Sequence, residues 1–168
     1  MLDYFQKITI GQYKAALQTL QNCIDECPLE QWRGKVANHS FSQSAFHALF
    51  FADIYLGKDL DEFKNQSFHK QHSSEFRDYE ELQSKVPENT YTKSFVMDYL
   101  EYCHRKVESV VGNETETALK AKSEIPWLEI TRGELHIYNI RHIQHHAAQL
   151  TMRLRLETNV NIGWVRSG

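Results

Sequence analysis

The stretch from Thr131 to Glu157 reads TRGELHIYNIRHIQHHAAQLTMRLRLE and predicts one long helix. Thr131 and Glu134 have the Thr-x-x-Glu spacing of a capping box, which marks where a helix begins. Residues four apart on a helix differ by about 40° around its axis and about 6 Å along it. His142 and His146 therefore project from consecutive turns of one face, where two imidazoles can bind one divalent ion.

The helical period also predicts the surroundings of these histidines. Their face carries four further residues, Leu135, Tyr138, Gln149 and Arg153. It borders an apolar face, so we expect both imidazoles to be partly buried and neutral, the form that binds a metal. Tyr138 and Gln149 are candidates for orienting an imidazole or contacting a substrate, and ordinary buried polar residues are the alternative. His145 is rotated about 60° from His142, so it is expected to support the site, to contact substrate or to lie at the surface.

A separate histidine, His47, lies in an earlier predicted helix over residues 41–57, with Ser40 or Ser42 as its cap. A lone histidine among aromatic residues is most often a core residue. Together with the later pair, however, His47 can complete a face of three ligands. Three protein ligands leave positions on a metal open for water or substrate, whereas structural sites are usually closed. Asp53, about 120° from His47 around the helix, is expected to be a structural hydrogen-bonding group.

Periodic apolar residues predict two more long helices. One runs from Ile10 to Cys27, and the other is capped by Thr90 and ends at Gly112, with a short helix following over 114–122. Between Lys58 and Asn89 the periodicity fades, which indicates a long crossover that contains one short helix. No alternating pattern persists long enough to predict a strand. These elements predict an all-α fold, an antiparallel four-helix bundle with one long crossover, as a single domain over 1–168.

Composition limits the partners and the compartment. The 168 residues carry a net charge of −3 and no basic stripe, which argues against a nucleic-acid partner. No apolar run approaches the roughly 20 residues of a membrane span, and the N-terminal residues lack the order of a secretory signal, so a cytoplasmic location is expected. The three cysteines, Cys23, Cys27 and Cys103, have no framework spacing and are expected to be reduced packing residues.

The motif His-x-x-His-His-x-x-Gln-Leu, from His142 to Leu150, resembles the fourth-helix signature of the DinB/YfiT-like superfamily. The run FSQSAFHALFFADIYL, from Phe41 to Leu56, is similar to the pattern around the first metal ligand of that family, about 95 residues earlier. The resemblance implies a four-helix bundle that binds one divalent metal, commonly zinc or nickel, through His47, His142 and His146. It also implies a homodimer. One departure is Ala147-Ala148, where the family often has Arg-Gly.

The better understood members of this superfamily act on low-molecular-weight thiols. They include thiol S-transferases that use bacillithiol and a mycothiol-dependent isomerase. The resemblance therefore implies a metal-dependent transferase or hydrolase acting on a small-molecule substrate, with Lewis-acid chemistry at the metal.

Two alternatives stay open at the level of the sequence. The chain can be a non-catalytic metal binder, with a fourth ligand from His69, His72 or His104. It can also be an interaction protein that acts through its dimer face. No nucleic-acid or membrane partner is expected in any of these cases.

Overall fold

The computed structural model describes residues 1–83 and 85–168, and helices dominate both parts. Four helices are long: α1 (Leu2–Glu26), α3 (Phe41–Leu56), α7 (Lys93–Gly112) and α9 (Arg132–Thr158). The expected all-α class is confirmed. The first helix begins at Leu2, a good deal earlier than its apolar stripe predicts.

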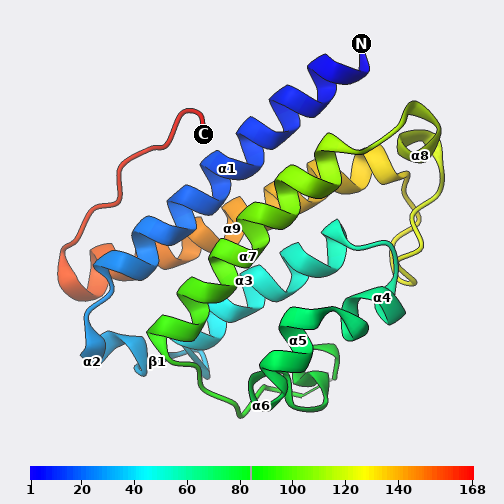
Figure 1. The fold of residues 1–168 in the computed structure, drawn as a ribbon. Coiled ribbons are helices and arrows are strands. Elements are labelled where there is room, and N and C mark those ends of the chain that lie inside the picture. The colour runs from blue at the N-terminus through cyan, green and yellow to red at the C-terminus, as the bar shows by residue number, and fades with distance from the viewer. Residues whose placement is uncertain (84) are drawn as a thin grey trace.

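The four long helices lie side by side (Figure 1). Helix α1 packs against α7 and α9, and α3 packs against the same two helices from the opposite side. The largest fully buried side chains come from α1, α3, α4 and α7: Tyr13, Leu17, Leu20, Ile24, Phe41, Phe46, Leu49, Phe50, Ile54, Leu56, Phe63 and Tyr99. Burying this apolar surface is the main favourable contribution to the fold.

The beginnings of the two helices that matter for function are fixed by capping boxes. Ser40 accepts a hydrogen bond from the Gln43 backbone, and the Gln43 side chain accepts one from the Ser40 backbone. Thr131 and Glu134 make the same reciprocal pair at the start of α9, as predicted. For α7 the expected cap, Thr90, is wrong. Thr92 is the N-cap, because its hydroxyl accepts from the Phe95 backbone.

The crossover between α3 and α7 contains more helix than the sequence predicts. Instead of one short helix it has α4 (Leu60–Asn65), α5 (Ser67–Gln71), α6 (Ser73–Phe76) and the 3-10 helix η1 (Arg77–Leu82). Figure 1 shows these elements together beside α3 and α7. The short helix predicted over 114–122 is α8 (Glu116–Lys120).

A small hairpin was not predicted. Between α2 (Leu29–Trp32) and α3, strands β1 (Lys35–Val36) and β2 (His39–Ser40) pair antiparallel. Ala37 and Asn38 join them with positive φ at both residues, the backbone of a two-residue hairpin turn. Each strand has only two residues, too few to show an alternating pattern.

All three cysteines are free and buried, as expected. In the part of the chain that the structure describes, no helix combines the length and apolar character required to cross a membrane.

Candidate metal centre

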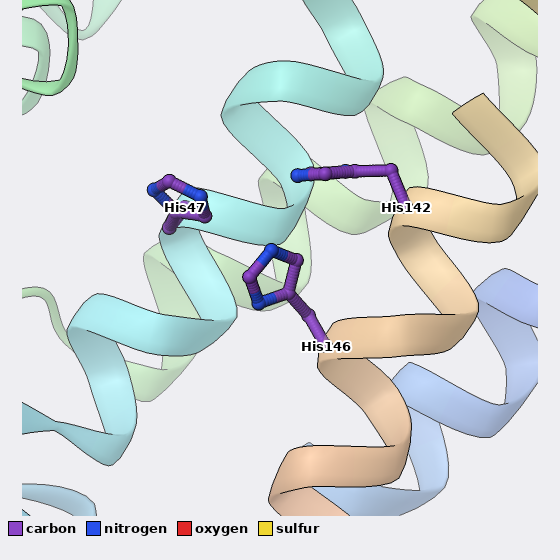
Figure 2. A group of neighbouring side chains, drawn as sticks. All are labelled: His47, His142 and His146. Carbon is purple, nitrogen blue, oxygen red and sulfur yellow. The ribbon is translucent and has the colours of Figure 1, made fainter. Parts of the chain in front are cut away.

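Helices α3 and α9 bring three histidines together. His47 lies in the second turn of α3, and His142 and His146 lie on consecutive turns of α9. Figure 2 shows the two α9 side chains extending toward His47. The ring centroids are 4.8 Å apart for His47 and His146, 4.5 Å for His142 and His146, and 5.8 Å for His47 and His142. One end of α3 and the middle of α9 thus share one cluster of imidazoles.

Two side chains of α9 fix its register against α3. The Arg132 guanidinium donates to the carbonyls of Tyr55, Leu56 and Gly57 at 2.7–2.9 Å, at the end of α3. The Asn139 amide, fully buried, donates to the carbonyl of Ala52 at 2.9 Å. The Arg132 bonds satisfy carbonyls that the end of α3 leaves without helical partners, and the Asn139 bond adds a second link between the two helices. They also fix the position of α9 along α3, so that His142 and His146 face His47.

The cluster can hold a metal ion. One nitrogen of each ring lies within 4.8 Å of the other two. Zinc–imidazole bonds are about 2.0–2.1 Å, so the nitrogens of a tetrahedral site are about 3.4 Å apart. The nitrogens of the cluster therefore need to approach one another by at most about 1.4 Å, which small side-chain rotations supply.

The protonation of the cluster suits a cation. Burial, followed by the nearby His146 and His47, lowers the pKa of His142 to about 3. Burial and His47 likewise lower the pKa of His146 to about 4. Both rings are therefore neutral near pH 7 and offer lone pairs to a metal without first losing a proton. Aromatic rings contribute to the burial, since Phe51 and Tyr55 each lie 5.8 Å from the His142 ring.

Two of the three imidazoles have a hydrogen-bond partner on Nδ1. Nδ1 of His47 lies 2.6 Å from Oε2 of Glu81, and Nδ1 of His146 lies 3.0 Å from Oε1 of Gln149. Such partners orient a ligand ring and fix which nitrogen faces the metal. Nδ1 of His142 is buried without a hydrogen-bond partner among the described residues, so no protein group fixes the tautomer of that ring.

A cavity of about 470 Å³ opens beside His47 and His146. Its wall is built from the hairpin, α3 and α9, and it is lined by Val36, Ala37, His39, Ser44, His47, His146, Gln149, Leu150 and Arg153. The Arg153 guanidinium donates to the carbonyl of Gly34 at 2.8 Å and to that of His39 at 3.4 Å, which holds the hairpin against α9. The volume suits a small molecule, and the mixed apolar and polar lining is typical of a ligand site.

The other predicted site residues lie around the cluster rather than in it. Tyr138 packs edge-to-face on Tyr55, with ring centroids 5.3 Å apart. His145 is exposed, and its ring meets the edge of the His146 ring at 5.1 Å. With His142, both line a second depression of about 550 Å³ along α9. Among the described residues, neither Tyr138 nor His145 hydrogen-bonds an imidazole of the cluster.

The candidate fourth ligands are elsewhere. His69 is buried against Asp53, with Nε2 2.9 Å from Oδ2, and His72 packs on Phe68. His104 lies on α7. In the described residues the group of possible ligands contains His47, His142 and His146 alone. Asp53, expected to be structural, is fully buried and accepts four side-chain hydrogen bonds, from His69, Gln66, Tyr99 and Lys106.

Sequence reasoning missed Glu81 and the hairpin wall. Glu81 is 34 residues from His47, in a crossover without periodic apolar residues, so no spacing connects the two side chains. The hairpin residues have neither an Asn-Gly turn nor strands of readable length. Only the folded structure shows that Glu81 and the hairpin lie beside the histidines.

No protein-family model matches the chain, and no curated protein or solved structure is significantly similar to it. The interpretation of the site therefore depends on its geometry.

Proposed function

We propose that this protein is a divalent-metal-binding enzyme of the DinB/YfiT-like type, a transferase or hydrolase that acts on a small molecule, with a low-molecular-weight thiol as one reactant. The proposal includes the four-helix bundle arrangement of that superfamily. The observation that carries it is the convergence of three histidine nitrogens within 4.8 Å, beside a cavity of about 470 Å³.

The number of protein ligands favours catalysis over a structural clamp. Structural zinc sites usually have four protein ligands, whereas catalytic sites have three and an open position. Only three candidate ligands meet among the described residues, and the cavity reaches two of them. A bound zinc or nickel ion supplies Lewis acidity, which lowers the pKa of a thiol or water beside it.

The residues of the chain have distinct tasks in this proposal. The three histidines hold the ion and, unlike carboxylate ligands, leave its charge uncompensated. Gln149 orients His146 through the 3.0 Å contact at Nδ1. Leu150 and Val36 give the cavity an apolar wall that excludes water from part of the substrate, while Ser44 and His39 offer polar contacts.

The first test is the metal content of purified variants. We expect His47→Ala and His142→Ala each to lose the metal, because two imidazoles hold a divalent ion much more weakly than three. His145→Ala is the matched control, since it removes an adjacent imidazole of α9 that lies outside the ligand group. Elemental analysis measures the bound zinc and nickel. Full metal retention by His142→Ala would contradict the assignment.

The same proteins then test for catalysis. Wild-type protein loaded with zinc, nickel or manganese is incubated with chlorodinitrobenzene and cysteine, glutathione or bacillithiol, and separately with nitrophenyl acetate for hydrolysis. We expect metal-dependent product from the wild type and none from His47→Ala. If no combination gives metal-dependent product although the metal is bound, the protein is a metal binder without this activity.

A further inference from the structure

The carboxylate of Glu81 lies at the edge of the metal centre, against His47. Its side chain is 4% exposed, and Oε2 lies 2.6 Å from Nδ1 of His47. Because a carboxylate only accepts hydrogen bonds, Nδ1 of His47 is the donor. The lone pair of this imidazole is then on Nε2, which is the nitrogen left free for a metal.

Within residues 1–83 and 85–168, the negative charge of this carboxylate has no lysine or arginine partner. Among the described residues, Glu81 forms no ion pair with a lysine or arginine, although Arg77 lines the same crevice. Its second oxygen, Oε1, is buried and has no hydrogen-bond partner in the described part of the chain. Burying a carboxylate in this way is unfavourable unless positive charge lies nearby. A divalent cation on His47 provides that charge through the imidazole.

Glu81 reaches the site because the crossover is anchored at two places that precede it. Upstream, the fully buried Asp53 of α3 accepts hydrogen bonds from Gln66 and His69, which ties α5 to α3. Three and two residues before Glu81, Asp78 and Tyr79 have φ of 49° and 54°, a left-handed backbone conformation that residues other than glycine rarely adopt. The Tyr79 hydroxyl donates to the carbonyl of Lys64 at 3.1 Å and holds this bend in place.

We propose that Glu81 is a positioning residue for the metal, which fixes His47 with Nε2 toward the ion, and that metal binding in turn stabilises residues 77–83 against the four long helices. This inference rests on the proposed metal site. It adds a part of the crossover to a centre otherwise made by α3 and α9, and it links occupancy of the metal to the order of that segment.

The experiment is a titration of the metal-free protein with Co²⁺, followed by Zn²⁺ in competition, for wild type, Glu81→Gln and Glu80→Gln. Glu81→Gln keeps the shape of the side chain and removes its charge. Such partners of a ligating histidine typically contribute 10–100-fold to metal affinity, so we expect a loss of that size. Glu80→Gln also removes one negative charge, one residue away, where the carboxylate accepts from the Glu88 and Asn89 backbones and contacts no histidine of the cluster, and we expect the affinity to stay close to that of the wild type.

Hydrogen exchange of the peptide covering 77–83 is the second measurement. In the wild type we expect Zn²⁺ to slow exchange there, and in Glu81→Gln we expect this effect to be largely lost. Circular dichroism of the metal-free variants shows whether each is folded. A purely structural role of Glu81 would lower the stability of the metal-free protein and leave the affinity of the folded protein for Co²⁺ unchanged, and that result would overturn the inference.

The two proposals fail in different ways. If the wild type binds no divalent metal, the proposed function fails and this inference fails with it. If the wild type binds metal and His142→Ala does not, while Glu81→Gln binds as tightly as the wild type, the metal site stands and the role of Glu81 is wrong.

Discussion

At the scale of single residues, burial sets the chemistry of the cluster before any metal is present. His142 and His146 are half-buried among aromatic rings and next to one another, and both have pKa values far below that of a free histidine. The ring centroids of His142 and His146 are 4.5 Å apart, a distance at which neutral imidazoles pack without repulsion and two imidazolium ions would repel each other. The fold therefore keeps His142 and His146 deprotonated through the range in which a metal would bind.

This arrangement predicts how the stability of the metal-free protein depends on pH. The unfolded histidines titrate near 6.5, and the folded ones near 3 and 4. Between these values the unfolded chain binds more protons, so the free energy of unfolding falls as the pH falls from about 6.5 to about 4. Each histidine contributes at most about 1.4 kcal/mol per pH unit. The fully buried His136 and His69, whose pKa values are also lowered, act in the same direction.

Urea unfolding in the presence of a chelator at pH 7.5 and pH 5.5 measures this loss. The double variant His142→Gln/His146→Gln lacks both titrating groups, and its loss of stability over the same interval should be smaller. Equal losses in the two proteins would show that these rings are not held neutral by the fold.

The sequence placed His142 and His146 on one face, and the family resemblance added His47, but neither predicted most of what surrounds the three rings. A spacing of four on a capped, periodic helix places His142 and His146 on one face whatever the rest of the fold is. The partner of His47 could not be predicted in the same way, because Glu81 comes from a polar segment without a period. The partner of His146 could be predicted, because Gln149 lies one turn away on the same helix.

At the scale of elements, the crossover is fixed by a buried charge cluster. Nζ of Lys106, on α7, lies 2.5 Å from Oδ1 of Asp53 on α3, and both side chains are at most 9% exposed. Burial alone would raise the pKa of Asp53, but Lys106 and the hydrogen bond from His69 outweigh it and lower that pKa. Tyr99 donates to the same carboxylate at 2.8 Å. One acidic residue thus joins α3, α5 and α7.

Removing one partner from this cluster leaves a buried charge uncompensated. We expect Lys106→Ala to lower the free energy of unfolding by about 3–5 kcal/mol. Arg105→Ala is a matched control on the same helix, because the Arg105–Glu101 pair is exposed, and such pairs contribute about 0.3–0.5 kcal/mol. Urea denaturation of both variants compares the two values. Similar small losses for Lys106→Ala and Arg105→Ala would mean that the Asp53 cluster contributes little.

Element boundaries followed from the sequence where a cap left a clear signature. The Ser40 and Thr131 capping boxes start α3 and α9 where the pattern predicts. At α7 two threonines, Thr90 and Thr92, precede the helix, and the pattern alone does not choose between them. Thr92 caps the helix because it directly precedes the first helical residue, Lys93, and its hydroxyl accepts from the Phe95 backbone N–H. The crossover helices have four to six residues each, shorter than the window in which a period can be recognised.

At the scale of the whole molecule, the site connects helices that are distant in the chain. His47 and His142 are separated by the entire crossover and α7, and only the packing of α3 on α9 brings them together. Arg132 and Asn139, in the N-terminal half of α9, stabilise that packing through hydrogen bonds to four carbonyls of residues 52–57. A metal on the three histidines would tie the same two helices further along, between α3 and the middle of α9.

An ion held in this way binds the folded chain and not the unfolded one, so it raises stability by mass action. At a free metal concentration 100 times the dissociation constant, the gain is about 2.7 kcal/mol. For a chain of this size about 2–4 °C accompanies each kcal/mol, so we expect Zn²⁺ to raise the Tm of the wild type by about 5–10 °C. A chelator should reverse the change, and His142→Ala should show no increase. Thermal unfolding followed by circular dichroism measures both. An unchanged Tm for wild-type protein with demonstrably bound Zn²⁺ would mean that the ion holds equally well to the unfolded chain, and that α3 and α9 do not present a preformed set of ligands.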